Sequence, residues 1–522
     1  MVYLEQIISN NILFFQSFSL VNPDELYMEN ITSDLVVYVQ FSSAVINITL
    51  FFLIMLIIIN FIYNIFFKNI AYLIRLLRFI NLLFLSIIIT LLIIKFYFSL
   101  KLEQTAGLYI YDLKYNFFKE NSYLFYFEHF IIFSSSFSDA IIILSFITGL
   151  ICIELLGLKN LFKTVSNVNL FYIFNFFVII MVSTNNILIM FLSFEFIFLP
   201  TMYFVFKLGY SKKAEKANEI LFYWTLFGSF LVLCTLCYLY YIYNTLNYIY
   251  LQKETISKLE SQIIFIIFLL GFGIKIPLAP FHHWLLKVHV ESPTAFSIFL
   301  SGFLVKSALY CLFILLSLFN NIHNYFILTG WIFLSLIVAT LGLAKQTDIK
   351  KLIAWATIQE MTFMLIFLIF KQIFLTHTCI LFIILHGLMS SYMFYIVDML
   401  QRRFKTRALI FIKGLHILLP KLSKHIWFLI LLFSGFPLTA KFFIEWSLIS
   451  LMVDTHYSTL LFVILFVNFA GAIFFCKIMF TIIYGVQEED DLDFIETQKK
   501  EYGLLNFLVC FILILLWLIY IL

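Results

Sequence analysis

Charged residues are scarce in this chain of 522 residues. Only 12% of the residues are Asp, Glu, Lys or Arg, about half the usual share in soluble domains, whereas 63% are hydrophobic. The mean hydropathy is +1.04. This composition excludes a water-soluble globule. We therefore predict an all-α membrane protein that crosses the bilayer many times.

Cysteine and glycine are also sparse, with 7 and 16 residues. The cysteines lie mostly in apolar segments. The one CxxC pair, Cys234 and Cys237, has no second pair or histidines at metal-binding spacing. We find no Gly-rich nucleotide-binding loop in the sequence. We therefore expect inert thiols, and no metal site, iron–sulfur cluster or other redox centre in this chain.

The N-terminal stretch, MVYLEQIISNNILFF, has neither a basic signal-peptide region nor an Arg-rich presequence. We expect the spans themselves to direct membrane insertion. The chain contains 68 Phe residues and much Ile, Tyr, Asn and Lys, which A+T-rich codons encode. This bias leads to the hypothesis that an organelle genome encodes the chain.

Apolar runs of about 20 residues predict about fourteen transmembrane helices. Residues 1–43 are mixed in polarity and are expected to form an N-terminal extension outside the bilayer core. The spans are predicted at residues 44–67, 79–100, 136–158, 167–185, 186–208, 218–245, 261–279, 293–318, 324–345, 351–371, 374–400, 425–450, 457–485 and 503–522. We group them as 44–158 (the first three), 167–318 (the fourth to eighth), 324–485 (the ninth to thirteenth) and 503–522 (the C-terminal span).

Positive charges are distributed unevenly among the predicted loops. Loops after odd-numbered spans contain most of the lysines and arginines, including a cluster from Arg402 to Lys424. The positive-inside rule places these loops on the cytoplasmic or matrix side and both termini on the opposite side. We interpret Lys287, Lys350 and Lys351 as loop charges of this topological kind.

Two predicted spans are interrupted by Gly and Pro beside a charge. The seventh contains GFGIKIPLAP around Lys275, and the twelfth contains SGFPLTAKFFIEW, which includes Lys441 and Glu445. Interrupted helices in matching positions are typical of transporters with inverted repeats. Because the two lie five spans apart, we predict that 167–318 and 324–485 are inverted five-helix repeats. The alternative explanation is that the prolines fall in matching spans by chance and that no repeat exists.

Five ionisable residues lie in the interior of predicted spans: Glu195, Lys275, Lys306, His386 and Glu445. Ionisable groups at membrane depth are costly, and they commonly mark ion or proton pathways. We predict that Glu195 pairs with Lys275 and that all five side chains belong to a proton pathway at mid-membrane.

Each of these residues also has a purely structural interpretation. Glu195, Lys275 and Lys306 could extend to the membrane interface. His386 could do no more than make a hydrogen bond between helices. Lys441 could do no more than pair with Glu445 one turn away.

Five motifs resemble the antiporter-type membrane subunits of proton-pumping NADH:ubiquinone oxidoreductase, respiratory complex I. They are FLSFEFIFLP, GFGIKIPLAPFHHWLLKVHVESPTAFSIFLSGFLVK, AKQTDIKKLIAWATIQEM, LHGLMSS and SGFPLTAKFFIEW, and they follow the order of the family. The resemblance covers residues 136–485, and HVESPT is most similar to the chain 4 branch. It implies that Glu195 modulates the central lysine Lys275. It further implies that Lys306 is a bridging lysine of the mid-membrane proton pathway and that His386 is a connecting histidine. Glu445 would be the terminal carboxylate of the same pathway.

The resemblance also implies where the remaining chemistry lies. This chain would translocate protons, whereas FMN, iron–sulfur clusters and ubiquinone would be bound by partner subunits. The partners would be other membrane-arm subunits, especially the antiporter-like chains 2 and 5, together with membrane lipids. No nucleic acid partner is expected. The location implied is the mitochondrial inner membrane, with both termini on the intermembrane-space side.

Two residues depart from the pattern of the family. Glu360 stands where the family usually has a histidine, and Lys441 replaces a usually neutral residue. Glu360 and Asp398 are expected nearer the ends of their spans. Two other function classes stay open. A stand-alone cation/proton antiporter would use the same charges, whereas a structural membrane scaffold would leave the charges at depth unexplained.

Overall fold

The computed structural model is helical, and no strand occurs among the residues that it describes. These are residues 26–66, 71–106, 135–158, 166–209, 212–251, 258–318, 326–369, 373–454, 458–486, 503–510 and 512–513. In chain order the elements are α2 (Leu26–Phe66), α3 (Ala71–Ala106), α5 (Ser136–Leu158), α6 (Ser166–Ser183), α7 (Ile187–Leu208), α8 (Lys213–Tyr243), α9 (Tyr248–Leu251), α10 (Lys258–Lys275), α11 (His283–Glu291), α12 (Thr294–Phe299), the π-helix η3 (Leu300–Leu304), α13 (Val305–Ser317), α14 (Phe326–Ala344), α15 (Ile349–Ile369), α16 (Ile373–Phe404), α17 (Leu415–Leu418), α18 (Pro420–Phe433), α19 (Ala440–Asp454) and α20 (Ser458–Tyr484).

Within the described residues, 8 helical segments are long and apolar enough to cross a membrane. This confirms the predicted class of an all-α, multi-spanning membrane protein. The predicted spans between residues 44 and 485 coincide with helices, but the total of fourteen and the inverted repeats stay predictions. Helix α2 begins within the predicted extension 1–43, and residues 1–25 lie outside the described residues, as does part of the predicted last span.

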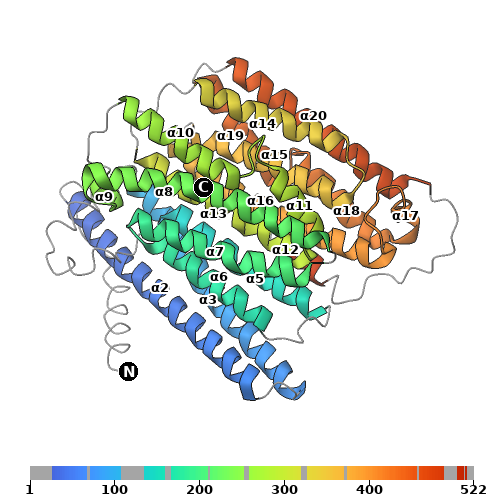
Figure 1. Cartoon of the computed structure of the whole chain (residues 1–522), viewed down its shortest axis with the longest axis horizontal. Helices are drawn as coiled ribbons and strands as arrows, with labels where there is room; N and C mark the ends of the chain where they lie inside the picture. The colour runs from blue at the N-terminus through green and yellow to red at the C-terminus, as the bar shows by residue number, and fades with distance from the viewer. Residues whose placement is uncertain are drawn as a thin grey trace.

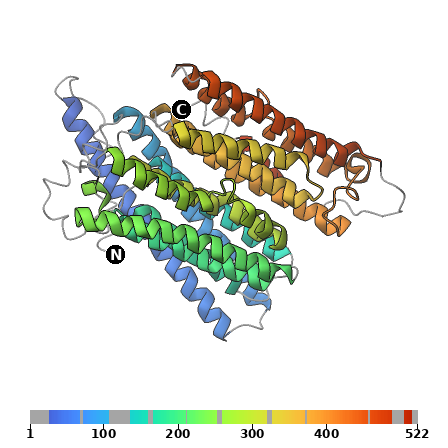
Figure 2. The same cartoon turned by 45° about the horizontal axis from the view of Figure 1, so that its top comes forward.

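The centre of the bundle is formed by α5 and α16. Every residue from Cys379 to Leu400 of α16 is buried, and this helix packs against α5, α12, α15 and α19. In Figure 1, α2 and α20 lie on opposite flanks of the molecule, and most residues from Leu461 to Tyr484 in α20 are not buried. A helix that is apolar on all sides remains stable there, because hydrocarbon rather than water surrounds it. Figure 2 shows that the blue-to-green and yellow-to-red parts of the chain gather on different sides.

Both predicted interruptions occur in the structure. Helix α10 ends at Lys275 and α11 begins at His283, with Pro277 and Pro280 between them. Proline has no backbone N–H, so the helical hydrogen bonds cannot continue through this stretch. Likewise α18 ends before Gly435, whose φ of +65° is a left-handed conformation that glycine adopts readily, and α19 begins after it.

The predicted span 293–318 contains a distortion that the sequence did not indicate. The π-helix η3 separates α12 from α13, immediately before the turn that carries Lys306. A Cβ on Gly302 in η3 would lie 2.8 Å from Thr148 of α5 and 3.4 Å from the carbonyl oxygen of Gly387 in α16. Glycine therefore lets these helices approach closely, and the widened turn lies beside the central helix α16.

Candidate functional site

The predicted contact between Glu195 and Lys275 is present. Glu195 lies near the middle of α7, and Lys275 is the last residue of α10. The ammonium of Lys275 donates a hydrogen bond to Oε1 of Glu195, and its Nζ lies 4.5 Å from the centre of the Phe194 ring. Lys275 is fully buried, so the carboxylate and the aromatic face replace the water that the charge has lost. The free carbonyls at the end of α10 also favour a cation there.

Lys306 and His386 occupy the middle of the bundle, and both are buried. Lys306 follows η3 and donates a hydrogen bond to the carbonyl oxygen of Ser301 within that π-helix. His386 lies in α16, which packs against both η3 and α19. These two residues therefore lie between the first interrupted helix and the second.

A second buried ion pair joins α15 to α19. The ammonium of Lys441 lies 2.6 Å from Oε1 of Glu360 and 3.5 Å from Oε1 of Glu445, and it also donates to the carbonyl oxygen of Phe433 at 2.7 Å. Glu445 accepts a hydrogen bond of 2.8 Å from Asn468 in α20. Lys441 thus lies between two carboxylates, of which the closer is the one that sequence alone did not pair with it.

The position of Glu360 corrects the sequence analysis. We expected this carboxylate near the end of a span, but it lies in the middle of α15 and is 2% exposed. It also interacts electrostatically with Lys306. Its Oε2 atom is buried and has no hydrogen-bond partner among the described residues. Glu360 is therefore placed between Lys306 and Lys441.

The structure brings the five predicted site residues into one bundle, where Lys275, Lys306 and His386 are buried and Glu195 and Glu445 are partly buried. Helix α10, which ends at Lys275, packs against α13, the helix that holds Lys306. Among the described residues, no hydrogen bond joins Lys275 to Lys306 or Lys306 to His386. Passage of a proton along these residues would therefore need water molecules or side-chain movement between the two ion pairs.

One buried ion pair was missed entirely. Nζ of Lys95 in α3 lies 2.6 Å from Oδ1 of Asp139 in α5, and neither side chain is exposed. The signal was present, because Lys95 stands alone in the apolar run IIITLLIIKFYF and Asp139 lies in the first turn of a predicted span. The rule that flagged Lys275 applies equally to this pair.

Lys350 is a second correction. We interpreted it as a loop charge, but it is fully buried and donates a hydrogen bond of 2.7 Å to the carbonyl oxygen of Ser292. Its neighbour Lys351 is exposed, as expected. The two adjacent lysines therefore have different roles, because successive residues of a helix face different directions.

Metal binding has no support in the part of the chain that the structure describes, where no group of three or more His, Cys, Asp or Glu residues could hold an ion. The site instead consists of buried ion pairs beside two interrupted helices. This combination is typical of one class, that of polytopic membrane proteins that move ions or protons.

Comparison with known proteins gives the family. Residues 184–473 match the family model described as the NADH:quinone oxidoreductase/Mrp antiporter transmembrane region. The NADH-ubiquinone oxidoreductase chain 4 of Paramecium tetraurelia is 32% identical over 364 residues, which cover 69% of this chain and 76% of that protein. The chain 4 of Acanthamoeba castellanii is 29% identical over 350 residues, which cover 66% of this chain and 69% of that protein. The chain belongs to this family, and the predicted resemblance is confirmed.

Solved structures show the same fold. A chain of respiratory complex I from Thermus thermophilus with bound aureothin matches with a TM-score of 0.69 and 16% identity, covering 90% of this chain and 96% of that one. A chain of the Mrp complex from Dietzia sp. matches with a TM-score of 0.66 and 14% identity, covering 85% and 81%. All five predicted site residues lie within the matched family region, whereas Lys95 and Asp139 lie outside it.

Proposed function

We propose that this chain is a proton-translocating membrane subunit of NADH:ubiquinone oxidoreductase, respiratory complex I. The observation that carries the proposal is the buried ion pair of Lys275 with Glu195 at an interrupted helix. A second pair, Lys441 with Glu360, lies at the other interrupted helix. Membership of the family and the names of its chain 4 relatives support the same function.

The first ion pair provides a means of controlling proton release. Lys275 is fully buried, whereas the side chain of Glu195 is 26% exposed at the surface of the chain. A neighbouring subunit that attracts or displaces Glu195 would leave the ammonium of Lys275 without its counter-charge. A buried charge that loses its partner is destabilised by roughly 3–5 kcal/mol. Lys275 would then pass on its proton, and the return of Glu195 would favour uptake of another.

The second ion pair provides the end of the pathway. A proton that reaches Lys306 or His386 would meet Glu360, whose Oε2 is unpaired among the described residues, and then Lys441. Glu445, beside Lys441, would be the terminal carboxylate that the resemblance to the family implies. The proposed pathway thus contains the five predicted residues with Glu360 and Lys441 added between His386 and Glu445.

The surroundings of the pathway are part of the proposal. The chain would have fourteen spans in which 167–318 and 324–485 are inverted repeats, and it would lie in the mitochondrial inner membrane with both termini in the intermembrane space. Its partners would be membrane-arm subunits, especially the antiporter-like chains 2 and 5. Redox chemistry would belong to other subunits that bind FMN, iron–sulfur clusters and ubiquinone.

A stand-alone cation/proton antiporter is the second candidate, because the fold is shared with a chain of the Mrp complex. Purification in mild detergent separates the two. Co-purification with subunits that contain flavin and iron–sulfur clusters would support the complex I subunit. Isolation of the intact chain in an assembly that has no flavin or iron–sulfur clusters would support the antiporter.

The test of the proposed function is the substitution Lys275→Ala. We expect native gels to show assembled complex, while proton pumping and coupled NADH-driven quinone reduction both fall. Lys207→Ala, which removes a lysine that contacts Tyr203 on α7, is the matched control. Wild-type pumping by an assembled Lys275→Ala complex would remove the central lysine from the mechanism and favour a scaffold.

A further inference from the structure

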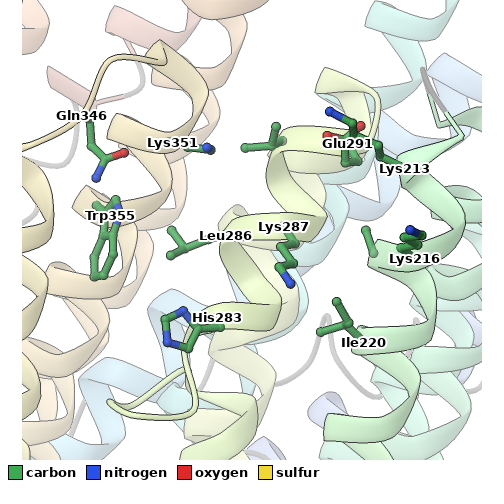
Figure 3. A pocket seen from close by; sticks show the side chains of 12 residues that line it. Lys213, Lys216, Ile220, His283, Leu286, Lys287, Glu291, Gln346, Lys351 and Trp355 are labelled. Atoms are coloured by element: carbon green, nitrogen blue, oxygen red, sulfur yellow. The ribbon is translucent and has the colours of Figure 1, made fainter.

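A groove outside the proposed pathway lies between α8, α11 and α15. Its volume is about 600 Å³, and α11 packs against both of the other helices. Figure 3 shows the side chains around it, with Lys213 and Glu291 toward one end and His283 and Ile220 toward the other. None of the residues assigned to proton movement lines this groove.

Four lysines line the groove: Lys213, Lys216, Lys287 and Lys351. All four are exposed, and they come from three different helices. Glu291 is the one carboxylate among the lining residues, so the groove is strongly positive. Such convergence of lysines attracts a ligand with negative charge, since like charges held together destabilise one another.

The position of the lysines along the helices indicates their depth. Lys213 and Lys216 lie in the first turn of α8, and Lys351 lies in the first turn of α15. Lys287 lies about one turn before the end of α11. All four therefore lie near one end of the bundle, the end that the positive-inside rule assigns to the matrix. Lipid headgroups are found at this depth of a membrane.

The remaining wall of the groove is apolar. Ile220 lies one turn beyond Lys216, and Trp355 lies one turn beyond Lys351, so both are deeper in the bundle than the lysine above them. Leu286 adds a further apolar side chain from α11. A free phosphate ion or a nucleotide would leave this surface uncovered. A molecule with an anionic head and a hydrocarbon tail would fill both parts.

We propose that this groove binds an anionic membrane phospholipid, with its headgroup phosphate among the four lysines and an acyl chain against Ile220 and Leu286. Basic pockets between transmembrane helices on the cytoplasmic or matrix side are suited to such headgroups. Trp355 lies one turn beyond Lys351, and tryptophan is enriched near the headgroup level of membranes. The lipid would tie α11, the helix that follows the interruption at Pro277 and Pro280, to α8 and α15.

The test uses the assembled complex purified in mild detergent and a phosphatidylglycerol that carries a photoreactive diazirine in its acyl chain. After illumination, mass spectrometry of peptides identifies the labelled segments. The test variant is Lys216→Gln with Lys287→Gln. The matched control is Lys405→Gln with Lys424→Gln, which removes two exposed lysines outside the groove. Lys405 lies at the same end of the bundle, because the nearby Arg407 carbonyl accepts a hydrogen bond of 3.1 Å from the first residue of α15.

We expect label in the α8 and α11 segments, competed by unlabelled phosphatidylglycerol and not by phosphatidylcholine. The double variant should bind about tenfold or more weakly, because each lysine near the membrane surface contributes about a fivefold preference for anionic lipid. The control should stay within about twofold of wild type. In the wild-type complex, labelling should also weaken as salt rises to about 1 M, where charges are screened within about 3 Å.

Several outcomes would overturn the proposal. Equal competition by phosphatidylcholine would mean that the lysines do not select the headgroup, and competition by millimolar inorganic phosphate would identify a phosphate site. Crosslinking of these segments to a neighbouring subunit, without lipid label, would identify an acidic protein segment as the occupant. If the double variant does not assemble, salt-independent labelling of the wild-type complex would still contradict the proposal.

Discussion

Oε1 of Glu360 lies 2.6 Å from the ammonium of Lys441, although the two residues are 81 positions apart in the chain. Both side chains are buried, and Lys441 also lies 3.5 Å from Glu445. A lysine between two carboxylates can keep its charge in the interior while either acid exchanges a proton. The relationship therefore extends the proposed pathway by two residues and leads to the first prediction.

Replacing Glu360 by Gln should uncouple pumping from electron transfer. The amide keeps the shape of the side chain but cannot take up and release a proton, so we expect the ratio of protons pumped to NADH oxidised to fall about tenfold or more. Glu360→His should retain more pumping, because imidazole carries protons near neutral pH. Both are measured in sealed vesicles against Glu215→Gln, an exposed carboxylate on α8. An unchanged ratio in assembled Glu360→Gln complex would exclude Glu360 from the pathway.

Lys275→Arg separates the charge of the central lysine from its proton exchange. The guanidinium should still pair with Glu195, so we expect assembly at the wild-type level. Arginine remains protonated in proteins, so pumping should be lost. Native gels report assembly, and a pH-sensitive dye reports pumping, with Lys207→Arg on α7 as the control. If Lys275→Arg pumps normally, Lys275 acts only as a fixed positive charge.

The ion pair of Lys95 with Asp139 should serve stability rather than pumping. Asp139→Asn leaves the ammonium of Lys95 buried without its counter-charge, which should destabilise the subunit by about 3–5 kcal/mol. The double substitution Lys95→Met with Asp139→Asn should recover most of that loss, since buried ion pairs can be replaced by uncharged groups at little cost. Thermal dissociation of the purified complex measures both. A double variant that is stable but cannot pump would place the pair in the pathway.

Gly435→Ala should disturb the second interrupted helix. The left-handed conformation at this residue costs alanine about 1–2 kcal/mol, and its Cβ would lie 2.8 Å from Oε2 of Glu445. We expect lower thermal stability together with reduced pumping, because Glu445 must move. Gly330→Ala on α14 is the matched control, as no heavy atom lies within 4 Å of its added methyl group. Equal behaviour of the two variants would show that Glu445 tolerates displacement.

Much of the fold was evident from the sequence. Apolar runs placed helices between residues 44 and 485, and Gly and Pro beside charges marked both interruptions. Glu195 and Lys275 were paired correctly, because each stood alone in a long apolar run and needed a counter-charge. These inferences rest on the cost of bringing a polar group or an unsatisfied backbone into hydrocarbon, which each segment reveals by itself.

Other features depended on how the helices pack. Sequence alone paired Lys441 with Glu445 one turn away. In the structure α15 packs so that Glu360 lies closer to the same ammonium than Glu445 does. Packing likewise buries Lys350, joins Lys95 to Asp139 and gathers four lysines from three helices into one groove. The sequence thus determined which residues are costly in a membrane. Only the tertiary structure decided their partners, because these depend on the rotation and contact of helices far apart in the chain.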